Sequence, residues 1–444
     1  MIISKVFSGK RYAVLGLARS GLATVDSLAA SGASVTAWDT REEARQAVAG
    51  KAEIADPLLI DLAGFDGVVV SPGVPLNRHP IADHARAAGV PIIGDIELFA
   101  LARPTLPPHK VVGITGTNGK STTTALIHHI VEAAGIPAMM GGNIGLPILG
   151  QNPLPAGGVY VLELSSYQID LTFSLDCDIA VLLNITPDHL DRYDGFEAYV
   201  ASKARLFAMQ SAGHARIVAT DDPNTCAIAR QAENVTQVHG GEIAPGDQAR
   251  WPSLQGPHNA QNVAVARAAS RALGIGEEVI ERALASYASL PHRMQRVGEC
   301  HGVLYVNDSK ATNPASAAPA LAAYPPSEGG PRIHWIVGGL AKGEGLDECV
   351  PYFGNVKAVY TIGEAGHMFA SLLRGHMPVD DSEMLLTAVR RAARVAEPGD
   401  VVLLSPACAS FDQFRDFEAR GDAFVAAVAA LGEEGSRTGE MAGA

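Results

Sequence analysis

The sequence predicts an α/β protein of three domains, each built on a mostly parallel sheet with helices on both faces. Short β-rich runs alternate with Ala-rich helical stretches along the whole chain, which is the pattern of parallel strands connected by helices. The length of 444 residues corresponds to two to four domains at roughly 100–200 residues each. Apolar residues make up 47% and charged residues 18%, so each domain can bury its own core.

Composition excludes several classes of function. The net charge is −13 and no cluster of Lys and Arg stands out, which argues against a nucleic-acid partner. The five cysteines are scattered without paired ligand spacing, as in a cytosolic protein with reduced thiols. The first residues lack the apolar region of a signal peptide, and no run approaches the roughly 18 apolar residues of a membrane span. We therefore expect a soluble, cytoplasmic protein with no membrane span.

The first section contains expected strands at 12–17, 34–40 and 67–73. Its first turn, GLARSG, resembles a dinucleotide-binding fingerprint but has Ala18 at the middle glycine. Asp39 follows the second strand, where an acidic side chain can face a ribose or a base. The lost glycine argues against close approach of a pyrophosphate, so a nucleotide site and a plain packing turn stay equally open. The SPGVP turn either binds a ligand or only ends the third strand.

A Pro-rich linker is expected at 102–110, and the second section follows it. Its first strand, 110–115, precedes a helix that ends near Gly135. Three further strands of this section are expected at 158–164, 177–186 and 216–221.

A candidate phosphate loop, GITGTNGKS, connects the first strand of this section to its helix. Glycines let successive backbone N–H groups converge on phosphate oxygens, and the helix N-terminus favours negative charge. Lys120 would reach the β- and γ-phosphates, and the Ser121 hydroxyl would hold Mg²⁺. Position 114 is Ile where the usual pattern has Gly. The alternative is a Gly-rich turn that binds no ligand.

Candidate Mg²⁺ ligands follow the next two strands of this section. Glu163 ends one strand, where an acidic residue can face the ligand cleft of an open sheet. NITPDHLDRY ends the other and offers Asp188, His189 and Asp191. Because Mg²⁺ prefers oxygen ligands, His189 by itself is read more readily as a turn or cap residue. Lys203 by itself is read as a solvated helix lysine.

The third section begins near 288–300 and ends with a helix from about Asp412 and a polar, frayed tail at 432–444. Its expected strands are 304–308, 333–339, 356–363 and 400–405. Loops at the carboxyl ends of parallel strands form a ligand crevice, and lysines with hydroxyls there suit a small anionic substrate. Singly, each loop could be a simple turn or cap. The polar and aromatic residues at these strand ends are Asp308, Lys310, Thr312, Asn313, Lys342, Ser405, Ser410 and Phe411.

These motifs together resemble the Mur ligase family over about residues 10–430. The matching segments, in order, are GITGTNGKST, LELSSYQ, NITPDHLDRY, GPHNAQN, LPHR, NDSKATNP and SPACASFDQF. The last two single out the member that adds glutamate, against another Mur-type or folylpolyglutamate-type ligase. The resemblance implies a Rossmann-like UDP-substrate domain at 1–101, a central P-loop ATPase domain at 102–291 and a Rossmann-like glutamate-binding domain at 292–444.

The resemblance also implies an activity. ATP would phosphorylate the alanine carboxylate of UDP-N-acetylmuramoyl-L-alanine, and the amine of D-glutamate would attack the acyl phosphate to give an amide, ADP and phosphate. The residues themselves leave the chirality of the glutamate open. The cofactors would be ATP and Mg²⁺, the pathway cytoplasmic peptidoglycan precursor synthesis, and the protein a monomer. Closure of the domains around the acyl phosphate is expected, with hinges near 102–109 and 290–298.

Site residues carry over by motif. Those implied for ATP are Gly116, Thr117, Asn118, Gly119, Lys120, Ser121, Thr122, Asn259, Arg293 and Asp308. Those implied for the metal are Ser121, Glu163, His189 and a carbamylated Lys203. Those implied for the substrates are Arg19, Ser20, Asp39, Thr40, Gly73, Asn143, Ser165, Lys310, Thr312, Lys342, Ser410, Phe411 and Phe417. Catalytic roles are implied for Lys120, Glu163, His189, Lys203, Lys310 and Lys342. Ala18 and the loop GGLAKGEG depart from the usual family pattern.

Two other hypotheses stand against the ligase. An NAD-dependent oxidoreductase rests only on GLARSG and Asp39, and it leaves the phosphate loop without a role. A non-catalytic UDP-sugar sensor with an inactive ATPase is the other, and intact Lys120, Glu163, His189 and Lys203 argue against it.

Overall fold

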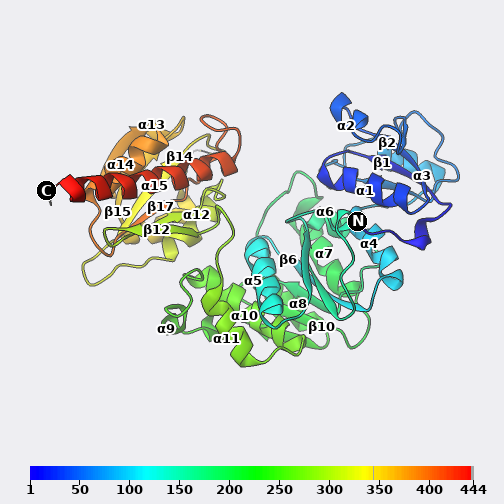
Figure 1. Ribbon diagram of the computed structural model, residues 1–444, viewed down its shortest axis with the longest axis horizontal. Helices are drawn as coiled ribbons and strands as arrows, with labels where there is room; N and C mark the ends of the chain where they lie inside the picture. The colour runs from blue at the N-terminus through cyan, green and yellow to red at the C-terminus, as the bar shows by residue number, and fades with distance from the viewer. Residues whose placement is uncertain (344, 442–444) are drawn as a thin grey trace. The chain divides into compact units, whose positions relative to one another are not determined.

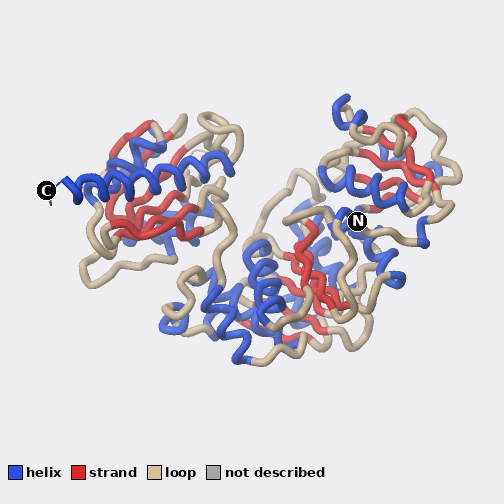
Figure 2. The backbone as a smooth tube through the Cα atoms, viewed as in Figure 1, coloured by secondary structure: helices blue, strands red, loops and turns tan. Residues whose placement is uncertain are grey.

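A computed structural model describes residues 1–343 and 345–441 of the chain (Figures 1 and 2). The chain contains three mostly parallel sheets with helices around each, which confirms the predicted fold class. It divides into two compact units, residues 1–242 with 261–284 and residues 243–260 with 285–444. In the described part of the chain, no helix has the length and apolar character needed to cross a membrane.

The first sheet has five parallel strands in the order β3-β2-β1-β4-β5. Alternating residues of β1 point to opposite faces, so Tyr12 and Val14 pack with helix α1 while Ala13 and Leu15 pack with helix α3. The strands are β1 Arg11–Leu15, β2 Ser34–Trp38, β3 Glu53–Ile54, β4 Gly67–Val70 and β5 Ile92–Ile93. The helices are η1 Lys5–Phe7, α1 Arg19–Ala30, α2 Glu42–Gln46, α3 Ile81–Ala88, α4 Asp95–Ala102 and η2 Arg103–Thr105.

The central sheet has six parallel strands in the order β11-β10-β9-β6-β8-β7. Its strands are β6 His109–Thr115, β7 Ala138–Gly142, β8 Gly158–Glu163, β9 Ile179–Leu182, β10 Ala215–Ala219 and β11 Val235–Val238. Its helices are α5 Lys120–Ala133, η3 Ile148–Gly150, α6 Ser166–Asp170, α7 Gly195–Ala208, α8 Pro223–Gln231, η4 Gly240–Glu242, α10 Pro257–Ala272 and α11 Glu277–Ser286. Helix α9 Pro245–Gln248 belongs to the second compact unit. Because β6 lies between β8 and β9, the loops that follow these three strands meet at one edge of the sheet.

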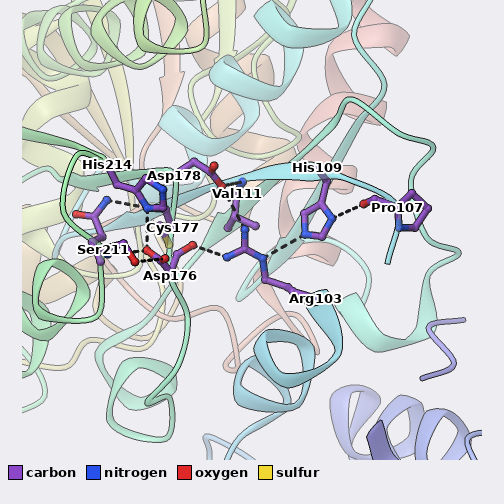
Figure 3. A network of polar contacts seen from close by, with 10 residues as sticks. Arg103, Pro107, His109, Val111, Asp176, Cys177, Asp178, Ser211 and His214 are labelled. Carbon is purple, nitrogen blue, oxygen red and sulfur yellow. Dashed lines mark hydrogen bonds and ion pairs between the residues drawn. The ribbon is translucent and has the colours of Figure 1, made fainter. Parts of the chain in front are cut away.

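The Pro-rich stretch at 102–110 is anchored to the central sheet and is not a free linker (Figure 3). The Arg103 guanidinium donates to the Asp176 carbonyl, to Asp178 Oδ2 at 3.2 Å and to His109 Nε2 at 3.2 Å. Asp178 Oδ2 also accepts from the Val111 N–H of β6 at 2.8 Å. These contacts argue against a hinge at 102–109, because bending there would break several partly buried hydrogen bonds at once.

The first and central sheets also share a hydrophobic core, which includes Ile2, Val25 and Leu149. The Ile2 N–H donates to the Leu149 carbonyl at 2.8 Å, and Ser27 Oγ donates to the Ile2 carbonyl at 2.6 Å. The first residues of the chain therefore join the two sheets into one packed unit.

The third sheet has six strands in the order β12-β13-β17-β14-β15-β16, and only the β12–β13 pair is antiparallel. Its strands are β12 Gln295–Cys300, β13 Val303–Asn307, β14 Ile333–Gly338, β15 Val356–Ile362, β16 Val379–Glu383 and β17 Val401–Leu404. Its helices are α12 Pro314–Ala322, η5 Asp347–Asn355, α13 Gly366–Leu373, α14 Leu385–Val395 and α15 Phe417–Met441.

Helix α15, red in Figure 1, packs Phe424 and Val428 against Tyr305 of β13. It begins at Phe417, five residues after the predicted start at Asp412, and it continues to Met441. The prediction of a frayed tail from residue 432 stays a prediction, and residues 442–444 lie outside the described part of the chain.

Candidate active site

The candidate phosphate loop connects β6 to α5, as the sequence predicted. Lys120 and Ser121 begin the helix, and the residues before them form the turn. Gly119 has φ +83°, and a Cβ there would lie 2.5 Å from Asn262 Oδ1. Glycine is therefore required at this position for both conformation and space. The loop lies at a helix N-terminus, where backbone N–H groups can bind phosphate oxygens.

Asn184 and Gln261 hold this loop, and sequence reasoning did not select either residue. The Asn118 N–H donates to Asn184 Oδ1 at 2.8 Å, and Asn184 Nδ2 donates back to the Asn118 carbonyl at 3.1 Å. Asn184 Nδ2 also donates to Gln261 Oε1 at 3.0 Å. The motifs NITPDHLDRY and GPHNAQN contain both residues, but a support role behind the loop follows only from the fold.

Two lysines converge on one backbone carbonyl of the loop. Lys120 Nζ donates to the Gly116 carbonyl at 3.0 Å and to the Thr117 carbonyl at 2.7 Å. Lys203 Nζ, on α7, donates to the same Gly116 carbonyl at 2.8 Å. The interpretation of Lys203 as a solvated helix lysine is wrong, because only 2% of the residue is exposed.

The pKa of Lys203 is lowered to about 7, first by burial and then by the positive charge of Lys120. Its Nζ also lies 4.6 Å from the centre of the Tyr199 ring. The amine is therefore substantially neutral near physiological pH, which is the form of lysine that reacts as a nucleophile.

Glu163 ends β8 beside the phosphate loop. Its Oε1 accepts from Asn143 Nδ2 at 2.8 Å, and Asn143 follows β7. Its Oε2 is buried and has no hydrogen-bond partner. A buried carboxylate oxygen without a partner is costly unless a ligand completes its surroundings. Oxygen donors of this kind fit a divalent cation such as Mg²⁺.

His189 lies in the exposed loop after β9, with φ +54° and 49% of its side chain exposed. Its ring lies 5.1 Å from the Tyr167 ring, and its Nε2 lies 3.5 Å from Asp188 Oδ2. Across residues 1–343 and 345–441, no three His, Cys, Asp or Glu side chains form a ready metal cluster. The metal role of Ser121, Glu163, His189 and Lys203 therefore stays a prediction.

The predicted uridine residues lie at the carboxyl edge of the first sheet. Asp39 Oδ2 accepts from the Leu17 N–H at 2.7 Å. Hydrogen bonding from Arg41 lowers the pKa of Asp39 to about 2, so this carboxylate is charged at neutral pH. Gly21 is explained by packing, since a Cβ there would lie 2.0 Å from the Gly16 carbonyl oxygen.

The remaining predicted residues of the first section also lie at this edge. Arg19 and Ser20 begin α1, while the Thr40 and Gly73 carbonyls accept from Arg45 and Arg192. Further along the chain, Ser165 forms a capping box with Gln168 at the start of α6, which gives it a local structural role.

In the third sheet, the predicted residues follow β13, β14 and β17. Burial raises the pKa of Asp308 to about 7, and its carboxylate accepts from Ser405 Oγ at 2.9 Å and the Met294 N–H at 3.1 Å. Lys310 Nζ lies 3.8 Å from the centre of the Phe417 ring. The cation and the ring thus come together from two segments that are far apart in the sequence.

Arg420 is buried at 1% exposure and was missed by sequence reasoning. Its guanidinium donates to the carbonyls of Ser309, Cys408 and Ala409 at 2.9, 3.0 and 3.2 Å, so it joins two of the predicted loops. An arginine in a helix pattern gives no sign of such a role. The other predicted residues of the third section are buried Ser410, partly exposed Thr312 and Arg293, and exposed Lys342 and Phe411. Asn259, on α10, is also buried.

The hinge predicted at 290–298 is wrong for its second half. The His292 carbonyl accepts from the Lys310 N–H at 3.0 Å, and β12 pairs with β13 from Gln295 onward. Residues from Gln295 onward therefore belong to the third sheet.

Comparison with known proteins gives a consistent result along the chain. The descriptions "Mur ligase MurD-like, N-terminal domain", "Mur ligase middle domain" and "Mur ligase, glutamate ligase domain" match residues 10–94, 114–272 and 292–408. Proteins named UDP-N-acetylmuramoylalanine--D-glutamate ligase match at 67% identity in Novosphingobium aromaticivorans and 65% in Sphingopyxis alaskensis. These matches cover 98% and 97% of this chain, and 98% and 100% of the relatives.

Solved structures agree in fold. MurF ligase from Thermotoga maritima in complex with ADP has a TM-score of 0.59 at 15% identity, covering 96% of this chain and 98% of that one. UDP-N-acetylmuramate-alanine ligase MurC from the same organism has a TM-score of 0.57 at 15% identity, covering 95% and 99%.

Proposed function

This chain belongs to the Mur ligase family, and from that premise we propose that it joins D-glutamate to UDP-N-acetylmuramoyl-L-alanine. It is an ATP-dependent ligase that forms an amide bond in peptidoglycan synthesis. The sequence similarity to relatives of that name is high along the whole chain, so another Mur-type or folylpolyglutamate-type ligase is not favoured. Membership of the Mur ligase family also argues against the hypothesis of an NAD-dependent oxidoreductase.

The single observation that supports a working site is the buried, unpartnered Oε2 of Glu163 beside the lysine-rich phosphate loop. We assign Lys120 to the β- and γ-phosphates of ATP, and the loop 116–122 with Asn259, Arg293 and Asp308 to the rest of the nucleotide. Ser121, Glu163 and His189 would hold Mg²⁺, which when bound supplies positive charge against the phosphate oxygens. The transition state concentrates negative charge, so fixed cations there lower its energy.

A carbamylated Lys203 is the further part of this proposal. A neutral lysine amine attacks CO₂, forms an N–C bond and releases one proton, which turns a cation into a carboxylate-like anion. The lowered pKa of Lys203 provides the neutral amine that this reaction requires. The resulting anion would be a ligand of Mg²⁺ together with Glu163.

The substrate assignments follow the same logic. The γ-phosphoryl group moves to the alanine carboxylate, the glutamate amine attacks that carbon, and collapse of the tetrahedral intermediate releases phosphate. We propose that Arg19, Ser20, Asp39, Thr40 and Gly73 contact the UDP part of the substrate, and Asn143 and Ser165 the muramoyl part. Lys310, Thr312, Lys342, Ser410, Phe411 and Phe417 would contact glutamate and the reacting carboxylate.

The three domains at 1–101, 102–291 and 292–444 are part of the proposal, as are a cytoplasmic location and a monomeric state. The test is ADP release with UDP-N-acetylmuramoyl-L-alanine, ATP and Mg²⁺, run separately with D-glutamate, L-glutamate and meso-diaminopimelate. We expect turnover with D-glutamate alone. Turnover with another amino acid would keep the family and change the substrate, and ATP hydrolysis that ignores the UDP-substrate would overturn the ligase proposal. Silence with all three amino acids would favour the sensor hypothesis.

A further inference from the structure

Two loops on different sheets are tied together by side chains that donate to backbone carbonyls. The first loop, residues 71–78, follows β4 of the first sheet, and the second, residues 189–193, precedes α7 of the central sheet. Arg192 donates to the carbonyls of Pro72, Gly73 and Val74 at 3.2, 3.4 and 2.9 Å. In return, Asn77 Nδ2 and Arg78 Nη2 donate to the Asp191 carbonyl at 3.0 and 3.2 Å.

Arg192 is itself held in place by aromatic rings. Its guanidinium carbon lies 4.3 Å from the centre of the Tyr167 ring, an arrangement that favours a planar cation. The same ring lies 5.1 Å from His189 and is stacked on Tyr193 at 6.1 Å. Tyr193 donates its hydroxyl to Asp170 Oδ2 at 2.8 Å. The arginine that holds the first loop therefore packs on the ring that contacts the predicted metal residue.

We infer that Arg192 is a positioning residue that sets the distance between the UDP-binding loop and the reacting centre. This inference rests on the proposed function. A long substrate anchored through its UDP at one sheet and reacting at the next is productive only if the two sites keep a fixed separation. Displacement of the reacting carboxylate by about 1 Å is enough to cost up to about 100-fold in rate. A guanidinium that joins three consecutive carbonyls on one side to an aromatic stack on the other maintains that separation.

The hydrogen bonds suggest which substitutions are informative. The five hydrogen bonds end on four backbone carbonyls, so only the donors Arg192, Asn77 and Arg78 can be changed by mutation. Arg192→Ala removes three of the five bonds. Arg192→Lys keeps the charge, but an ammonium cannot reproduce the planar stack on Tyr167 or reach three carbonyls in the same way. Arg86→Ala is a control, because Arg86 is an exposed arginine on α3 beside the first sheet and forms a local ion pair with Asp83.

Steady-state kinetics of these variants with all three substrates is the first part of the test. We expect Arg192→Ala to lower kcat by about 10-fold or more and to raise the KM for UDP-N-acetylmuramoyl-L-alanine by a smaller factor, with unchanged KM values for ATP and D-glutamate. The activity of Arg192→Lys should lie between those of Arg192→Ala and wild type, and the activity of Arg86→Ala should match that of wild type. Guanidinium chloride at low millimolar concentration should partly restore the activity of Arg192→Ala and leave the activity of Arg192→Lys unchanged. Equal rises in KM for all three substrates, or kinetic constants equal to those of wild type, would overturn the inference.

Amide hydrogen exchange without any ligand is the second part, and it does not depend on the reaction. Faster exchange of residues 71–78 in Arg192→Ala and in Arg78→Ala, with the phosphate loop unchanged, supports the tie between the loops. Unchanged exchange in 71–78 in both variants overturns it. Should wild type fail to turn over D-glutamate, the proposed function fails, while the exchange result still decides whether Arg192 holds the two loops together. Arg192→Lys and Arg78→Ala keep the test possible if Arg192→Ala does not fold.

Discussion

Both ends of the central sheet carry charged and polar side chains, but these side chains are paired with one another at the amino end, whereas one carboxylate at the carboxyl end is incompletely paired. At the amino end, Arg103 and Asp178 bond to each other and to surrounding backbone, and His214 pairs with Asp176 at 2.8 Å (Figure 3). At the carboxyl end, Lys120 and Lys203 donate to the same carbonyl, and a buried oxygen of Glu163 has no partner.

The contrast separates stability from function. A network of partly exposed side chains with satisfied hydrogen bonds stabilises the start of β6 and does not need a ligand to complete it. Cations placed near one another and an unpartnered buried carboxylate oxygen cost stability, and such groups are typically kept where a ligand completes them. Substitutions at the carboxyl end should therefore change catalysis, and substitutions at the amino end should change stability.

Lys120→Ala should have the largest effect. We expect ADP release to fall by about 1,000-fold or more, because the variant loses the fixed charge opposite the β- and γ-phosphates. Binding of UDP-N-acetylmuramoyl-L-alanine, measured by calorimetry, should survive. Wild-type turnover would contradict the assigned role of the phosphate loop.

Lys203→Ala should lower kcat by about 100-fold or more, because the variant cannot form the carbamate. The wild-type enzyme offers a pH test of the same idea. Below the folded-state pKa of about 7 the amine is protonated and cannot attack CO₂, and above it the amine is neutral. Adding CO₂ at a fixed dissolved concentration to CO₂-depleted enzyme should therefore stimulate activity more at pH 8 than at pH 6. A near-wild-type rate for Lys203→Ala would remove the carbamate proposal.

Arg103→Met tests the opposite end of the sheet. Loss of the partly buried guanidinium leaves Asp178 and the Asp176 carbonyl with fewer donors, so unfolding should become easier by about 2 kcal/mol. KM and kcat of the folded enzyme should stay within about 2-fold of wild type, since the phosphate loop lies at the other end of β6. Thermal denaturation and kinetics of the same preparation check both statements. A large fall in kcat without destabilisation would overturn the contrast between the two ends.

Ser165→Ala should have the smallest effect on stability and activity. It tests whether Ser165 contacts the substrate or only caps α6. Loss of the capping box at α6 should cost about 1 kcal/mol. Ser165→Asn keeps a side-chain cap and should restore that stability, which denaturation measures. If Ser165 also contacts the substrate, both variants should raise the KM for UDP-N-acetylmuramoyl-L-alanine; if it is only a cap, neither should.

The site shows where prediction from the sequence reached its limit. Residues within motifs at strand ends, such as Lys120, Glu163 and Asp308, could be selected because the carboxyl ends of parallel strands meet at one edge. Asn184, Arg192 and Arg420 act by holding a loop in place. Their partners are backbone carbonyls or amides far away in the chain, and backbone groups leave no pattern in a sequence.

The strands divide in the same way. The predicted strands are the interior strands of the three sheets, such as β6, β14 and β17. The strands not predicted are the six at the sheet edges: β3, β5, β7, β11, β12 and β16. An interior strand is buried on both faces and reads as a continuous apolar run. An edge strand has one neighbour and more contact with solvent, so segments such as VDDSE and QRVGEC carry no such signal.

The sequence by itself determined the α/β class, the three-sheet organisation, the place of GITGTNGKS between a strand and a helix, and the family, because each depends on local patterns of burial or on contiguous motifs. Only the tertiary structure decided which edges complete the sheets, that 102–110 is anchored, that Lys203 is buried beside Lys120, and that Arg192 joins two loops. Those properties depend on long-range neighbours, and burial and the charge of a neighbour set the pKa and the role of a side chain more than its own identity does.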